Sequence, residues 1–181
     1  MTADPASCRL PLVDIETMQG EVGETLRSLP MRLNIIAMAA NAETCIIPQL
    51  QLGQAVMTGQ LLAPLHRELL ILLAAAIDDS PYVWSQHGTI AMQVGADERK
   101  VAALKSLDLS SEAFDDKERA LLAFGEQVVR AAHVDDAAFA NVASHFNARE
   151  IMEAILAIGY YMTMNRITAV TGTPLETGAT G

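Results

Sequence analysis

The sequence from His66 to His87 reads HRELLILLAAAIDDSPYVWSQH, an apolar run followed by a turn and a second helical segment. Pro64 suits the first position of a helix over residues 64–77, because a helix start leaves that backbone N–H unpaired in any case. Successive residues of a helix project about 100° apart, so nearly every side of this helix is apolar. A helix that is apolar all round is buried, and the stretch therefore predicts the centre of a helical core.

Glu68 lies one turn into this apolar helix. A carboxylate on a buried helix requires a partner. One interpretation is structural: a salt bridge with Arg67 or Lys105, or a favourable charge near the helix N-terminus. The other interpretation is functional, with Glu68 as part of a site that moves protons.

The second helix is predicted over residues 81–94, with Ser80 as its N-cap and Pro81 at its first position. Residues at three- and four-residue steps share one face of it: Ser80, Val83, Trp84, His87 and Ala91. A lone histidine on such a face is commonly a hydrogen-bonded core residue, but imidazole also exchanges protons near neutral pH. Tyr82 and Trp84 either fill the core or form the wall of an apolar pocket, and we favour the pocket because aromatic residues are scarce. Ser80 would act as a nucleophile only with a base one turn away.

Further helices are predicted over residues 15–27, 33–42, 48–57, 97–104, 116–132, 135–145 and 149–170, the last one capped by Asn147. No stretch alternates apolar and polar residues as a strand does, so we expect an all-α bundle. We expect a flexible arm over residues 1–13, one helical domain over residues 14–171 and a flexible tail over residues 172–181. The many apolar faces and the methionine-rich composition predict a homo-oligomer, whether a dimer, a trimer or a hexamer.

The net charge of −10 and the pI near 4.7 argue against a partner that is nucleic acid or an anionic membrane surface. No apolar run reaches the length of a membrane span, and no signal peptide is visible, so we expect a cytoplasmic protein. Cys8 and Cys45 are too few for a disulfide framework, and the apolar neighbours of Cys45 predict a buried, inert thiol. The four histidines show neither an HExxH nor an HxH pattern, so we expect no metal and no other cofactor.

Taken together, these residues resemble the carboxymuconolactone decarboxylase and alkylhydroperoxidase-D-like superfamily. In its peroxidase branch, a glutamate on one helix precedes Cys-x-x-Cys and a histidine on the next. Glu68 and His87 keep that spacing, whereas Ser80 and Val83 occupy the two cysteine positions. The pattern Tyr82-x-Trp84-x-x-His87 resembles the thiol-free branch, and the resemblance extends over roughly residues 30–176. It implies an alkylhydroperoxidase-D-like helical bundle, and the Arg-Glu pairs at residues 67–68 and 149–150 leave open a duplicated helical unit.

The resemblance implies that Glu68 and His87 form a proton relay. Thiol peroxidase activity is less expected, because serine and valine cannot replace the two redox thiols. We expect instead a cofactor-free lyase or isomerase of the carboxymuconolactone decarboxylase type, acting on a small carboxylated or lactone metabolite. His87 and Glu68 would move the proton, and the remaining roles fall to Arg67 or Arg166 as the carboxylate seat and to Tyr82 and Trp84 as the pocket wall.

Two alternatives stay open. Arg166 suits a surface charge or an intersubunit salt bridge as well as a substrate clamp. The whole chain could be a non-catalytic binding or scaffold protein, in which Glu68 and His87 pair as a buried polar contact.

Overall fold

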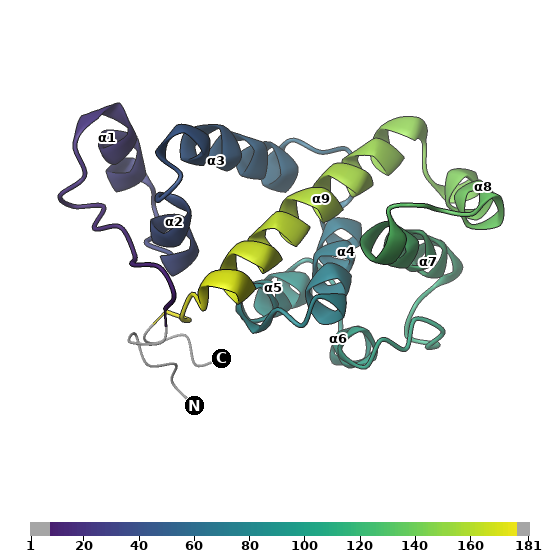
Figure 1. Cartoon of the computed structure of the whole chain (residues 1–181). Coiled ribbons are helices and arrows are strands. Elements are labelled where there is room, and N and C mark those ends of the chain that lie inside the picture. Colours follow the sequence, from purple (N-terminus) through teal and green to yellow (C-terminus); the bar gives the residue numbers. More distant parts are fainter. Residues whose placement is uncertain (1–7, 177–181) are drawn as a thin grey trace.

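The computed structural model describes residues 8–176, and within this range the chain forms helices joined by turns, with no strand (Figure 1). The predicted all-α class is confirmed. The helices are α1 (Gly20–Ser28), α2 (Asn34–Ala39), α3 (Glu43–Thr58), α4 (Pro64–Ile77), α5 (Pro81–Gln93), α6 (Glu98–Lys105), α7 (Asp116–Ala131), α8 (Asp136–His145) and α9 (Ala148–Thr171).

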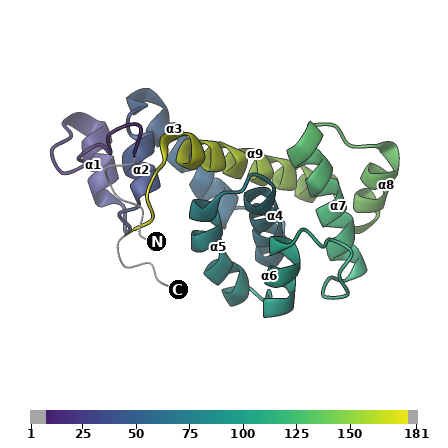
Figure 2. The same ribbon diagram turned by 60° about the horizontal axis from the view of Figure 1, so that its bottom comes forward.

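Helix α4 is the centre of the molecule. It packs against α5, α6, α7 and α9, and every residue from Arg67 to Ala75 is buried. Pro64 is its first residue, as predicted, and the apolar run leaves no side of the helix suited to water. Helix α9 crosses over α4 and α5, as the second view shows (Figure 2). Two polar residues, Arg67 and Glu68, are therefore held in the interior by the burial of their neighbours.

The turn between α4 and α5 brings the two helices side by side. Asp79 has a left-handed backbone with φ of 49°, and the backbone N–H of Ser80 donates to the carbonyl oxygen of Ala75 at 2.8 Å. Pro81 then begins α5 as predicted. Ser80 occupies the N-cap position, but the prediction of a capping side chain is wrong: its hydroxyl makes no cap bond. That hydroxyl is buried without a hydrogen-bond partner among residues 8–176.

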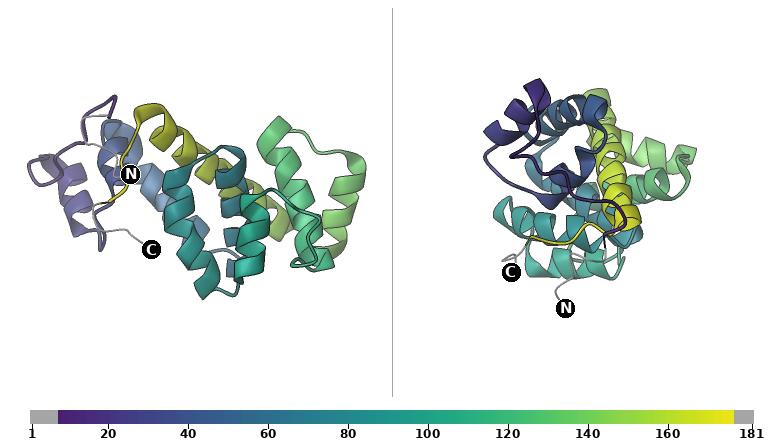
Figure 3. Two further views of the ribbon diagram at one scale, coloured as in Figure 1. Left: turned by 90° about the horizontal axis from the view of Figure 1, so that it is seen from below. Right: turned by 60° about the vertical axis from the view of Figure 1, so that its left-hand side comes forward.

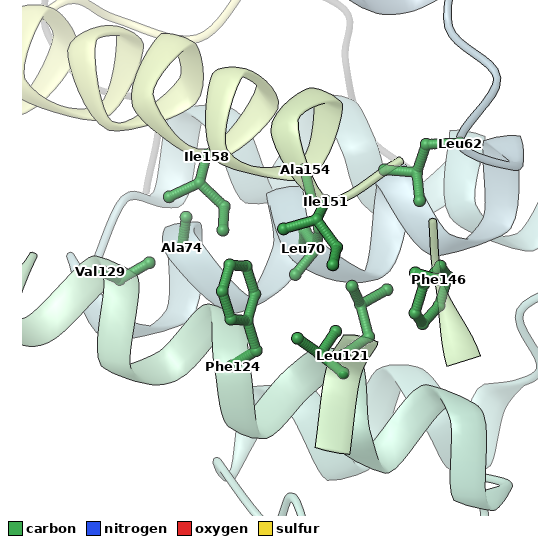
Figure 4. Packing of buried hydrophobic residues seen from close by; sticks show 11 residues of the cluster. Leu62, Leu70, Ala74, Leu121, Phe124, Val129, Phe146, Ile151, Ala154 and Ile158 are labelled. Atoms are coloured by element: carbon green, nitrogen blue, oxygen red, sulfur yellow. The ribbon is translucent and has the colours of Figure 1, made fainter. Parts of the chain in front are cut away.

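The largest apolar cluster lies where α4, α7 and α9 meet (Figure 4). Leu70 of α4, Phe124 of α7 and Ile158 of α9 are each at most 1% exposed. Burying a side chain of this size contributes about 1.5–3 kcal/mol. Capping boxes fix the starts of α7 and α9, with Asp115 and Asn147 as the N-cap residues, and the cap at Asn147 was predicted.

The N-terminal helices lie at one end of the molecule and α7 and α8 lie at the other (Figure 3). The predicted starts of two N-terminal helices, α1 and α3, are wrong. Helix α1 starts at Gly20, not near residue 15, because the Asp14 carboxylate accepts from the backbone N–H of Glu16 and holds a turn there. Helix α3 starts at Glu43 and includes Pro48, since the 1% exposed Ile46 anchors the turn that precedes the proline.

The two ends of the described chain meet beside the last turn of α9. The backbone N–H of Arg9 donates to the carbonyl oxygen of Thr171 at 2.8 Å, and Gly172 turns the chain away from α9 with φ of 68°. Residues 173–176 then run toward α2 and α5. The division into arm, domain and tail stays a prediction, and its outermost parts, residues 1–7 and 177–181, lie outside the described residues.

Across residues 8–176, no helix has the length and apolar character needed to cross a membrane. The cytoplasmic location, the homo-oligomer and the duplicated helical unit stay predictions.

Candidate functional site

Glu68 of α4 and His87 of α5 meet in the interior. The Nδ1 atom of His87 lies 2.7 Å from Oε2 of Glu68. The glutamate is fully buried, and the histidine is 8% exposed. The antiparallel pairing of two consecutive helices brings the two residues together across 19 positions in the sequence.

Arg67 is the second partner of Glu68. Its Nε donates to Oε1 of the carboxylate at 3.3 Å, and the arginine is 6% exposed. Lys105, the other predicted partner, instead lies over the ring of Trp84, with Nζ 4.5 Å from the ring centroid. The carboxylate of Glu68 is thus held between a guanidinium group and an imidazole.

This contact determines which nitrogen of His87 can act. A carboxylate accepts hydrogen bonds only, so Nδ1 carries the hydrogen and Nε2 keeps its lone pair in the neutral ring. Nε2 has no hydrogen-bond partner among residues 8–176. The ring packs against the ring of Tyr161 in a T-shaped arrangement, with the two centroids 4.6 Å apart. The arrangement presents a fixed imidazole with one nitrogen available for chemistry.

His87 forms part of the wall of a cavity of about 240 Å³. Helix α5 contributes Tyr82, Val83, Gln86 and His87 to its lining, and the rest comes from α2 with the preceding Leu33, α3 and α9. Most of the lining is aliphatic or aromatic, and no lysine, arginine, aspartate or glutamate of residues 8–176 belongs to it. The cavity therefore suits a small and largely apolar molecule.

Two consecutive tyrosines of α9 line this cavity, and sequence reasoning missed both. Burial raises the pKa of the Tyr161 phenol, and the nearby charge of Glu68 raises it further. The Tyr161 hydroxyl donates to Sδ of Met57 at 3.1 Å. Burial also raises the pKa of the Tyr160 phenol, so both hydroxyls keep their hydrogens at neutral pH. Tyr160 packs over Gly53, where an added Cβ would lie 2.2 Å from its hydroxyl oxygen.

Tyr82 lies in the lining, where the sequence placed it. Its hydroxyl donates to the carboxylate of Glu176 and accepts from the backbone N–H of Ile35 at 3.2 Å. Burial raises the pKa of this phenol, and the hydrogen bond to Glu176 adds to the shift. The Glu176 carboxylate also accepts from Nε2 of Gln86 and from the backbone N–H of Asn34, each at 2.8 Å. Gln86 carries no recognisable sequence signal, and Glu176 is only the last residue of the stretch that resembles the superfamily, with no role assigned to it.

The structure does not bring the other predicted binding residues to the cavity lining. Trp84 is half-buried beside Val83, but the helical rotation of one residue turns it toward α6 and Lys105. Arg166 is exposed and pairs with Asp78, with Nη1 3.2 Å from Oδ2. Arg67 of α4 pairs with Glu68 and does not belong to the lining. No predicted carboxylate seat therefore faces the cavity.

Both cysteines are also away from the lining. Cys8 donates from Sγ to the carbonyl oxygen of Gly172 at 3.4 Å. The prediction that Cys45 is buried is wrong: it is exposed on the first turn of α3, because Ile46 takes the inward position. In the described part of the chain, no group of three or more His, Cys, Asp or Glu side chains is placed to hold a metal ion.

The sequence matches no protein-family model and no curated protein. Solved structures match the fold over nearly the whole chain. An uncharacterised peroxidase-related protein from Silicibacter sp. TM1040 aligns with a TM-score of 0.81 and 22% identity, over 99% of this chain and 96% of its own. The alkylhydroperoxidase AhpD core of a peroxidase-related protein from Ralstonia eutropha JMP134 aligns with a TM-score of 0.83 and 17% identity, over 98% and 96%.

The chain has the alkylhydroperoxidase-D-like fold. A cysteine-to-alanine variant of the debrominase Bmp8, in complex with 2,3,4-tribromopyrrole, shares this fold with a TM-score of 0.74 and 18% identity, over 99% of this chain and 95% of its own. Proteins with this alkylhydroperoxidase-D-like fold thus include peroxidase-related proteins and a debrominase. The thiol-free branch stays a prediction for this chain.

Proposed function

We propose that the protein is a cofactor-free lyase or isomerase that moves a proton on a small carbonyl compound. The observation that carries the proposal is the Glu68–His87 pair, in which the carboxylate holds Nδ1 at 2.7 Å while the ring lines an apolar cavity. A histidine oriented in this way is suited to general acid–base catalysis.

In the isomerase reaction, Nε2 of His87 takes a proton from a carbon next to the carbonyl group. The C–H electron pair moves into the conjugated carbonyl and gives an enolate. Glu68 stabilises the imidazolium that forms, and His87, whose proton exchanges with solvent, then delivers a proton to a different carbon. In the lyase reaction, the C–C bond to a carboxylate breaks, CO₂ leaves, and the electron pair passes through the carbonyl before protonated His87 supplies a proton to carbon.

The hydroxyl of Tyr160 is the best-placed donor for the carbonyl oxygen. It lines the same cavity, and burial raises the pKa of its phenol, so it stays protonated at neutral pH. A neutral donor in a largely apolar cavity stabilises a developing enolate more strongly than it would in water. Tyr161 supports the ring of His87 from the side and donates to Met57.

The substrate class that the resemblance implies, an unsaturated lactone or a related carbonyl compound, is compatible with the lining. The lining contains no charged side chain among residues 8–176, so the reacting part of the substrate is expected to be largely apolar. The debrominase of the same fold supports this size class, since its bound compound, 2,3,4-tribromopyrrole, is a small ring. A thiol peroxidase is not proposed, because neither cysteine reaches the cavity and Ser80 and Val83 stand where the resemblance places the thiols.

Hydrogen–deuterium exchange tests the proposal directly. The protein would be incubated in D₂O with a panel of β,γ- and α,β-unsaturated five-membered lactones, and loss of carbon-bound hydrogen would be followed by proton NMR. We expect exchange or isomerisation of at least one lactone, and a loss of about 100-fold or more in His87→Gln. His145→Gln is the matched control, since His145 is an exposed residue at the end of α8.

An absence of both exchange and isomerisation across the panel would refute the catalytic proposal, as would either reaction if it persists in His87→Gln. Lactone binding without exchange would instead support the alternative of a non-catalytic binding protein.

A further inference from the structure

The carboxylate of Glu176 is held at the edge of the cavity by three donors from two separate parts of the chain. The hydroxyl of Tyr82 and Nε2 of Gln86 come from α5, and the backbone N–H of Asn34 comes from the start of α2. Both oxygens of the carboxylate are engaged: Tyr82 and Asn34 donate to Oε1, and Gln86 donates to Oε2. The three donors therefore match the shape of a carboxylate.

A backbone hydrogen bond fixes the direction of the Tyr82 hydroxyl. Its oxygen accepts from the backbone N–H of Ile35 at 3.2 Å, so its own hydrogen is directed elsewhere, toward Glu176. Burial raises the pKa of the phenol, which keeps that hydrogen in place at neutral pH. Tyr82 is 3% exposed, so its hydroxyl would need a new partner if Glu176 moved away.

Glu176 itself does not line the cavity. It follows the turn at Gly172, in a segment that α2 holds through a bond from Nδ2 of Asn34 to the carbonyl oxygen of Pro174 at 3.1 Å. Tyr82 and Gln86, in contrast, both line the cavity. Two of the three donor residues thus line the cavity, while their present acceptor comes from the C-terminal segment.

We propose that Tyr82, Gln86 and the backbone N–H of Asn34 form a binding site for the carboxylate of a small monocarboxylic acid, and that Glu176 fills this site from within the chain. A ligand carboxylate and the C-terminal segment then compete for the same donors. The site uses neutral donors, and hydrogen bonds to an ionised carboxylate are roughly twice as strong as those between neutral groups.

The site lies next to His87. Tyr82 and Gln86 are one turn apart on α5, and Val83 and His87 form the adjacent row of the same helix. A ligand whose carboxylate replaces Glu176 would extend its neighbouring carbon atoms past His87. The consequence for a substrate rests on the proposed function, whereas the binding site does not.

Competition sets the expected affinities. A tethered carboxylate has an effective concentration in the millimolar range, so a free carboxylate in millimolar amounts should displace Glu176 only in part. Removing the Glu176 carboxylate removes the competitor. We therefore expect Glu176→Ala to bind a small carboxylate at least tenfold more tightly than the unaltered protein.

Propanoate is a suitable probe, with propanamide as its uncharged counterpart. Binding would be followed by NMR through the side-chain amide of Gln86, assigned with Gln86→Leu. We expect Glu176→Ala to bind propanoate saturably and not to bind propanamide. Adding Tyr82→Phe should weaken the affinity for propanoate at least tenfold. Glu21→Ala is the matched control, since it removes an exposed glutamate of α1 and should behave like the unaltered protein.

The proposal is overturned if Glu176→Ala binds propanoate no more tightly than the Glu21→Ala control, or if Tyr82→Phe leaves its affinity unchanged. Circular dichroism checks the fold of each variant. Should Glu176→Ala not fold, Glu176→Gln offers the same comparison, because an amide of the same shape is a weaker occupant. The titration is repeated in His87→Gln. Propanoate binding that persists there, while deuterium exchange is lost, separates the binding site from the proposed catalysis. Loss of binding in Tyr82→Phe would then concern the binding site alone.

Discussion

Replacing Glu68 by glutamine is expected to destabilise the protein by about 3 kcal/mol. The carboxylate accepts from Arg67 at 3.3 Å and contacts His87 at 2.7 Å. A glutamine side chain has only one acceptor oxygen, so one of the two donors would face an NH₂ group. Arg67 is 6% exposed and would also lose its anionic partner. Breaking a buried ion pair by removing one member costs about 3–5 kcal/mol, and the value expected here is at the lower limit because glutamine still accepts one hydrogen bond.

Urea denaturation followed by circular dichroism would measure this loss as a lower transition midpoint with an unchanged slope. For a chain of this length, a loss of about 3 kcal/mol corresponds to a decrease in Tm of about 6–12 °C. The double variant Arg67→Met/Glu68→Leu is the control, because replacing both charges by apolar groups removes the unpaired cation. We expect it to recover most of the loss. A cost below about 1 kcal/mol for Glu68→Gln would refute the reasoning that Arg67 depends on this carboxylate.

Three further predictions follow from other positions. Gly53→Ala should destabilise by about 1–3 kcal/mol in urea denaturation, since its Cβ would lie 2.2 Å from the Tyr160 hydroxyl, and a second change, Tyr160→Phe, should relieve part of the loss. Absorbance at 295 nm should show Tyr82 and Tyr161 still protonated at a pH where a free phenol ionises; burial raises both pKa values, so stability should fall as pH rises above the unfolded value of about 10. Asn147→Ala should cost about 1 kcal/mol in thermal denaturation, because the Asn147 side chain accepts from two backbone N–H groups at the start of α9; no loss would contradict its role as a cap.

The part of the site that lies within one local motif could be predicted from the sequence. Pro64, Ser80 and Pro81 mark the ends of the two consecutive helices that carry Glu68 and His87, and the resemblance implied that these two residues act together. Arg67 was predicted as one of two alternative partners of Glu68, with Lys105 as the other, because a carboxylate on a buried helix requires a partner. Short-range rules were sufficient for the two helices, whereas the pairing of Glu68 with His87 came from the resemblance.

The rest of the cavity could not be predicted, because it comes from residues far apart in the sequence. Tyr160 and Tyr161 lie about 75 residues after His87, in an apolar helix where every large side chain gives the same signal. Glu176 falls in a Gly/Thr-rich segment whose composition indicates a flexible tail. Trp84 shows the opposite error: it shares a helix with His87, but one residue of rotation past Val83 directs it toward Lys105. Only the packing of α9 and the C-terminal segment against α5 shows which of these side chains reach the cavity and which do not.

The position of the Arg67–Glu68–His87 group also bears on why the protein contains it. Buried charges in a central helix add little net stability, since their desolvation offsets most of their attraction, and a well-packed apolar replacement is often neutral or better. Leucine and methionine would suit α4 at these positions as well as their neighbours do. Folding therefore gives no reason for a carboxylate with 0% exposure at residue 68, whereas a histidine that must hold and release a proton needs an anion at its second nitrogen. The same double variant separates the requirements of folding from those of proton transfer. Arg67→Met/Glu68→Leu should remain folded, and it should lose the deuterium exchange that His87 is proposed to catalyse.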